Sequence, residues 1–273
     1  MSSSKDFLPE KQGGGASASK ECCIILATTA LSLHPPLSLL LLSRLSAARF
    51  SSTSRDEKIP FPTSLLLHTK TTLIFSLLVS AVAVAALVEI LTGKNLYYLI
   101  SKRRRLSQAW AMLFLMLVCL NLGFDLPIGT DTNIRGGGDF VTARRLVFVL
   151  GLHEIMVLWR RSVVKPVVDE AVSGIFDEGF GWMEKAVMAA ALGYVWSRRL
   201  RGEVEALAAL PRVRTELGMH VEAADVLGWW LYYLTAAIGG VKVVKVLLWA
   251  ANKFYRHICR ISVLSNQSAE QLV

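Results

Sequence analysis

One run of uncharged residues constrains the fold of this chain more than any other feature. From Thr71 to Val88 the sequence holds 18 residues without a charged side chain, and Lys70 and Glu89 bound the run. An α-helix rises about 1.5 Å per residue, so about 20 residues are needed to cross the ~30 Å hydrocarbon core of a bilayer. We therefore predict a membrane-spanning helix over residues 71–91.

Three further apolar blocks lie next to charged residues. Leu106–Phe124 is uncharged over 19 residues and follows four consecutive basic residues at 102–105. Leu146–Trp159 has 14 residues between two arginine pairs. It would form roughly 21 Å of helix, which is short, but arginines at its ends can snorkel to the head groups. The last block follows Asp225 and is rich in Trp and Tyr. These blocks predict spans over 106–126, 144–161 and 226–247.

The fold class that follows is an all-α, polytopic membrane protein with about four transmembrane helices. Lipid offers no hydrogen bonds to the backbone, so apolar runs of this length pair their backbone groups internally as helices. Residues 165–211 alternate apolar and charged side chains at near-helical spacing, which predicts amphipathic helices. A fifth span in this region is the alternative. The predicted helical membrane domain covers 56–261, and 262–273 is predicted to be a flexible tail.

The first 55 residues are predicted to be disordered or presequence-like. Residues 22–55 contain many Ser, three Arg and no acid, which is the composition of an organelle transit peptide. His34, Pro35 and Pro36 interrupt an uncharged run inside this stretch, and a proline in a helix interior costs ~3 kcal/mol. A signal-type segment or an additional span is the alternative. An organelle membrane is therefore one candidate location for this multi-pass protein.

The charge of the chain is strongly basic, with a formal net charge of +9 at pH 7. Hydrophobic residues make up 53% and charged residues only 19%, against ~25% charged in soluble domains. The basic residues stand beside the apolar blocks, so we expect anionic lipids rather than nucleic acid as partners. Between the first two predicted spans, residues 92–105 hold five Lys or Arg and no acid, which predicts the cytoplasmic or equivalent side for this loop.

His153 and Glu154 are one candidate site, for an ion or a proton. They lie in the middle of the third apolar block. An ionisable group at the centre of a bilayer costs at least ~2.5 kcal/mol, so it usually has a partner or a task. Adjacent helical residues point about 100° apart, which argues against a shared site. The alternative is that Glu154 forms a structural bond with an arginine or the backbone.

Five basic residues near the C-terminus are the second candidate site. Their spacing keeps them near one face of a helix, and apolar residues occupy much of the rest. This pattern is typical of a basic helix at an anionic membrane surface. The alternative is an ordinary flank of a span. The expected contacts to anionic lipid are Lys242, Lys245, Lys253, Arg256 and Arg260.

No sequence motif in the chain indicates catalysis. The sequence contains no GxSxG, HExxH, paired-thiol or dinucleotide-binding pattern. We therefore predict a non-enzymatic integral membrane protein without cofactor or metal, acting as a structural, assembly or adaptor component with a membrane-protein partner. The alternative is a small transporter or channel subunit that uses His153 and Glu154.

Overall fold

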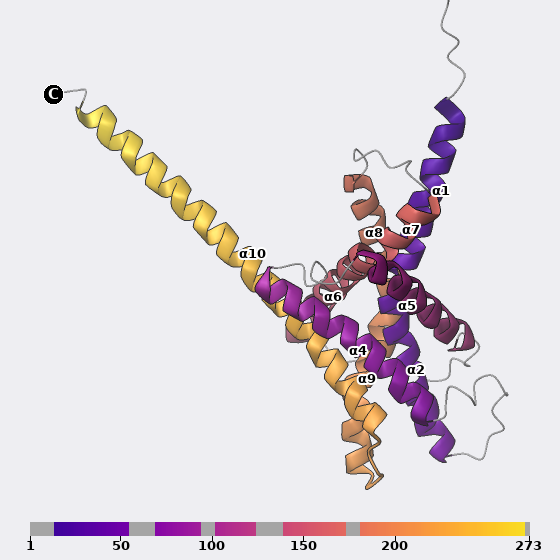
Figure 1. The fold of residues 1–273 in the computed structure, drawn as a ribbon. Coiled ribbons are helices and arrows are strands. Elements are labelled where there is room, and N and C mark those ends of the chain that lie inside the picture. The colour runs from indigo at the N-terminus through magenta and orange to yellow at the C-terminus, as the bar shows by residue number, and fades with distance from the viewer. Residues whose placement is uncertain (1–13, 55–68, 94–101, 124–138, 173–180, 271–273) are drawn as a thin grey trace, which may run out of the picture.

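The computed structural model describes residues 14–54, 69–93, 102–123, 139–172 and 181–270, and every regular element in these ranges is a helix (Figure 1). The α-helices are α1 (Gly14–Ser32), α2 (His34–Ser54), α4 (Thr69–Thr92), α5 (Lys102–Gly123), α6 (Asp139–Trp159), α7 (Lys165–Val172), α8 (Gly181–Val195), α9 (Arg201–Glu216) and α10 (Ala223–Glu270). Two π-helical turns, η2 (Arg160–Val164) and η4 (Trp196–Leu200), join α6 to α7 and α8 to α9. The predicted all-α class is confirmed for the described part of the chain.

Three described segments are long and apolar enough to cross a membrane. They are Cys22–Phe50, Thr72–Thr92 and Ala223–Arg260. The predicted spans 71–91 and 226–247 coincide with the second and third. The first lies in the region that the sequence assigned mainly to disorder or a presequence.

The other two predicted spans are helical where the structure describes them, but neither is among these three segments. α5 covers the predicted span 106–126 up to Gly123, beyond which the residues are not described, and it contains the apolar stretch Ser107–Val118. α6 follows most of 144–161, and its apolar surface is interrupted by Arg144, Arg145 and Glu154. Each such charge carries a cost in hydrocarbon, so apolar length alone does not make α6 a spanning helix.

The predicted amphipathic region 165–211 lies on α7, α8, η4 and α9, apart from residues 173–180, which fall outside the described residues. On α9, Val204 and Leu207 are buried against the core. The pattern was expected to end at Pro211, but α9 continues through this proline to Glu216.

Residues 14–54 form two helices, which differs from the expectation of disorder for 1–55. α1 and α2 meet at Leu33, and part of α2 lies in the hydrophobic core with Leu39 and Leu45 at most 1% exposed. Pro35 and Pro36 lie in the first turn of α2, where a missing backbone N–H is tolerated. The prolines therefore separate two packed helices. Residues 1–13 and 55 lie outside the described residues.

A tertiary hydrogen bond replaces the backbone bond that Pro35 cannot make. In a continuous helix the carbonyl of Leu31 would accept from the N–H of residue 35, and proline has none. The indole Nε1 of Trp159 on α6 donates to this carbonyl oxygen at 3.1 Å. The Nδ1 of His34 lies 2.7 Å from the same oxygen. Neighbouring helices often satisfy backbone groups freed by proline in this way.

Replacing Trp159 by phenylalanine should destabilise the bundle by about 1–3 kcal/mol, because it removes one of the two side-chain groups that bond the Leu31 carbonyl and leaves part of a fully buried site unfilled. Trp159 is 1% exposed. In a Pro35→Ala background, residue 35 regains an N–H for Leu31, so the same substitution should cost about 1 kcal/mol less. Thermal unfolding of the purified protein in detergent measures both costs. If Trp159→Phe costs the same with and without Pro35→Ala, the lost stability comes from the smaller side chain and not from the lost hydrogen bond.

A close helix crossing joins α6 and α10 through two glycines. A Cβ added at Gly151 would overlap the backbone oxygen of Thr235, and one added at Gly239 would overlap that of Val147. Small residues allow the backbones of two helices to approach this closely. On α10 the small residues at the crossing are Thr235 and Gly239, which lie one turn apart. Beside this crossing, the rings of Phe148 and Tyr232 stack with centroids 4.8 Å apart.

α10 is far longer than the bundle that it packs against. It has 48 residues, about 72 Å of helix. Its first part packs on α4, α6 and α9, and its second part projects away from them (Figure 1). We call the part from Ala250 to Arg260 the distal arm. The helix continues to Glu270, so residues 262–270, predicted as flexible, are helical.

Candidate functional site

A cavity of about 410 Å³ lies where the C-terminal end of α4 meets α6, η2 and α10. Five charged side chains line it, contributed by four different elements. They are Glu89 of α4, Glu154 of α6, Arg161 of η2, and Lys242 and Lys245 of α10. Two acids and three bases give the cavity a formal charge of +1.

Ion pairs across helix boundaries organise the cavity. The Nζ of Lys242 lies 2.8 Å from Oε1 of Glu154, which joins α10 to α6. The Nη1 of Arg161 lies 3.1 Å from Oε1 of Glu89, which joins η2 to α4. The Nζ of Lys245 donates instead to the backbone oxygen of Ile90. Lys245 is therefore the cavity cation whose described partner carries no charge.

The end of α4 explains why a lysine lies here. Gly93 has a positive φ of 65°, which ends the helix, and its N–H donates to the oxygen of Glu89 at 2.9 Å. The last carbonyls of a helix lack intrahelical donors and carry partial negative charge. Lys245 supplies a donor and a positive charge to one of them. Lys242 and Lys245 lie one turn apart, so both reach the same side of α10.

The predicted pair His153 and Glu154 lies within ion-pair distance but is not hydrogen-bonded. Nδ1 of His153 lies 3.8 Å from Oε1 of Glu154, which is too long for a hydrogen bond. The same oxygen of Glu154 bonds Lys242 more closely, at 2.8 Å, and Glu154 lines the cavity with this lysine. The sequence predicted an arginine or the backbone as the structural partner of Glu154. The structure shows Lys242 of α10 as this partner, a residue predicted to belong to the other candidate site.

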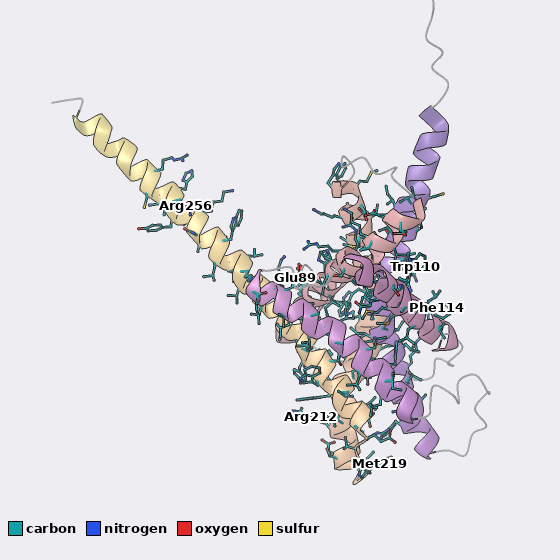
Figure 2. The ribbon with its side chains drawn as sticks, in the orientation of Figure 1. Glu89, Trp110, Phe114, Arg212, Met219 and Arg256 are labelled. Carbon is teal, nitrogen blue, oxygen red and sulfur yellow. The ribbon has the colours of Figure 1, made fainter. Side chains whose placement is uncertain are left out.

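The predicted set of five basic residues is divided between two places. Lys242 and Lys245 line the cavity, whereas Lys253, Arg256 and Arg260 lie farther along the distal arm. Figure 2 shows Arg256 far along the projecting helix and Glu89 at the junction of α4 and α10. Trp249, at the edge of the cavity, connects the two groups, because Nζ of Lys253 lies 5.0 Å from its ring centroid.

Glu89 and Arg161 are site residues that the sequence marked only as the edges of apolar blocks. Both are bound to the cavity by tertiary contacts over a separation of 72 residues. A charged residue at the end of each of two apolar blocks, with opposite signs, was the one signal that pointed to a pair. Many other such pairs were equally compatible with the sequence.

Ion pairs also join the helices away from the cavity. Arg44 of α2 bonds Glu203 of α9 through two nitrogens at 2.7 and 3.1 Å. Arg145 of α6 bonds Glu205 of α9 with the same two distances. Bidentate pairs of this kind fix the relative orientation of two elements. Charged side chains thus help to hold this bundle together.

Among the described residues, the most deeply buried ion pair joins α9 to the start of α10. Nη1 of Arg214 lies 2.9 Å from Oδ2 of Asp225, and the two side chains are 3% and 1% exposed. Nearby, Nη1 of Arg49 lies 3.2 Å from Oε2 of Glu222. The pair at Arg214 has almost no access to water, so its geometry matters more than that of the exposed pairs.

The cavity carries charge but no arrangement typical of a catalytic or metal centre. Within the described ranges, no group of three or more His, Cys, Asp or Glu side chains could hold a metal ion. The lining offers guanidinium and ammonium donors together with carboxylate acceptors, so it can bind a small polar anion or a zwitterion. No protein-family model, curated protein or solved structure matches this chain.

Proposed function

We propose that the protein is a non-enzymatic, multi-pass integral membrane protein that acts as a structural, assembly or adaptor component. The three apolar segments support the membrane placement. α5 and α6 would complete the embedded bundle, with the charges of α6 neutralised by pairs such as Glu154–Lys242. An organelle membrane is one candidate location.

The distal arm is the observation that carries the adaptor role. Its apolar residues are widely exposed, with Phe254 and Tyr255 at 68% and Ile258 at 49%. From Lys242 to Arg260 the chain has five Lys or Arg and no acid. A helix of about 72 Å exceeds the ~30 Å hydrocarbon core, so much of α10 would lie outside it. An exposed apolar helix face outside the bilayer core supports docking of a membrane-protein partner.

Site-specific photo-crosslinking in native membranes tests the adaptor role. A photoreactive residue in place of Phe254 should give protein adducts of one or a few defined sizes. The same residue in place of Trp182, which is 73% exposed on α8, is the matched control and should give none of these bands. Adducts to lipid alone at Phe254 would overturn the adaptor role.

A transporter or channel subunit is the second candidate, because Glu154 lines a cavity. The proposed structural role predicts that proteoliposomes show no proton or cation flux, and that Glu154→Gln leaves the flux at the background level. Its expected effect is on stability, below about 1 kcal/mol, since Lys242 is 40% exposed and solvent weakens the pair. Flux above protein-free liposomes that falls with Glu154→Gln would favour transport. The matched control is Glu216→Gln, an exposed acid on α9.

A further inference from the structure

We propose that the cavity between α4, η2 and α10 binds the phosphate group of one anionic phospholipid. This inference rests on the membrane placement proposed above, and it assigns a ligand to a cavity that the adaptor role leaves unused. The argument comes from the charge of the cavity, its depth along α4 and its apolar edge.

The charge of the cavity fits one negative group. Glu89 and Glu154 balance Arg161 and Lys242, which leaves Lys245 as the excess positive charge. The phosphodiester of a phospholipid carries one negative charge and four oxygens that accept hydrogen bonds. Lys245 can donate to it as a point charge, and Arg161, which uses Nη1 for Glu89 and is 58% exposed, has further N–H donors.

The cavity lies at the depth where lipid phosphates are found. The uncharged part of α4 ends at Val88, so Glu89 and Gly93 mark the level at which the helix leaves the hydrocarbon. The polar head-group layer adds about 5–8 Å on each side of that core. Figure 2 shows Glu89 at this end of α4, against α10. A phosphate at this level needs no insertion into the hydrocarbon.

The side of the membrane also fits an anionic lipid. The chain that follows α4 carries Lys94 and the basic residues 102–105, which predict the cytoplasmic or equivalent face. Anionic lipids are concentrated in the leaflet on that face. The cavity would therefore lie on the side of the membrane where anionic lipids are concentrated.

The edge of the cavity is apolar and can hold the acyl chains. Val246 and Trp249 line it from α10 and are 52% and 65% exposed, and Leu91 of α4 is 58% exposed close by in the chain. Tryptophan is enriched at the level of lipid head groups because its ring is apolar and its N–H is polar. A lipid with its phosphate at Lys245 would place its chains along these side chains.

Quenching of Trp249 by brominated lipid measures the site directly. The full-length protein is reconstituted in phosphatidylcholine nanodiscs with increasing brominated phosphatidylglycerol, and Trp249→Phe identifies the signal of this residue. The wild type should bind brominated phosphatidylglycerol about 25-fold more tightly than brominated phosphatidylcholine, because two basic groups contribute. Each basic group near an anionic surface contributes about a fivefold preference. Arg161→Gln with Lys245→Gln should therefore abolish the selectivity.

The matched control removes two charges from the same protein outside the cavity. Arg256→Gln with Arg260→Gln should reduce the selectivity less than twofold. An equal loss in this control, or no selectivity in the wild type, would overturn the proposal. Lys245→Gln alone keeps both ion pairs intact and so guards against misfolding of the double variant. It should lower the selectivity about fivefold, and an unchanged value would also overturn the proposal.

A second arm of the experiment separates lipid from a soluble phosphate. Glycerol 3-phosphate at millimolar concentration is added to nanodiscs of phosphatidylcholine only, and the unfolding temperature is measured. No shift is expected, whereas phosphatidylglycerol should raise it. An equal rise with both would assign the cavity to a soluble phosphate and overturn the lipid assignment. Failure here leaves the photo-crosslinking result unaffected, so the two proposals fail separately.

Discussion

Replacing Gly239 by alanine is expected to cost about 1–3 kcal/mol of stability, near the upper end of that range. The added methyl group would overlap the backbone oxygen of Val147, and a backbone cannot move aside as a flexible side chain can. α6 and α10 would have to separate, which also loosens the pair Glu154–Lys242. Thermal unfolding of the purified protein in detergent, followed by circular dichroism, measures the effect.

Gly240 provides the matched control for this prediction. It is the next residue on the same helix, and a Cβ there would meet nothing within 4 Å. Alanine is a better helix former than glycine, so Gly240→Ala should stabilise by up to ~1 kcal/mol. The two neighbouring substitutions should thus have opposite signs. If both stabilise the protein, the close crossing of α6 and α10 does not exist.

Gly151 tests whether the two glycines form one contact. Gly151→Ala should destabilise for the same reason, since its Cβ would overlap the oxygen of Thr235. Combining it with Gly239→Ala should cost less than the sum of the single changes, because one separation of the helices relieves both overlaps. Additive costs would indicate two independent contacts.

Replacing Arg214 by leucine is expected to cost about 3–5 kcal/mol, the largest single-residue effect in our set. The substitution leaves the carboxylate of Asp225 buried at 1% exposure without the guanidinium that lies 2.9 Å from it. Arg49 also attracts this carboxylate, but its guanidinium is paired with Glu222 at 3.2 Å. Chemical denaturation in a mild detergent gives the free energy of unfolding.

Arg212 and a double variant complete the test of the buried pair. Arg212 is exposed on the same helix, so Arg212→Leu should change stability by no more than about 0.5 kcal/mol. Arg214→Leu with Asp225→Leu removes both charges and should recover most of the loss, because a buried ion pair is often replaceable by apolar side chains. A double variant as unstable as Arg214→Leu would show that the loss comes from shape and not from charge.

The N-terminal region shows what composition alone cannot settle. A Ser-rich, acid-free segment with two prolines fits a presequence, and it also fits two helices that meet at a proline. The difference lies in whether another element satisfies the carbonyl that Pro35 frees. Trp159 does so from a position 128 residues away. The residues around Pro35 do not indicate that Trp159 will donate this hydrogen bond.

The candidate site shows the same limit from another direction. Glu154 stood out in the sequence because a carboxylate in an apolar block needs compensation. The identity of its partner was not available there, because Lys242 lies 88 residues later and belonged to a different pattern. Glu89 and Arg161, which complete the cavity, looked like ordinary ends of apolar blocks. Only the packing of α4, α6, η2 and α10 brings the four charges together.

The sequence by itself determined the helical class and the position of the apolar segments at 71–91 and 226–247. These features depend on the period and the length of apolar runs, which can be read directly from neighbouring residues in the sequence. The tertiary structure alone decided which charges pair, where the glycines of α6 and α10 touch, and that α2 enters the core. Such contacts join residues distant in the chain, and their free energy depends on distance and burial, which one-dimensional order does not contain.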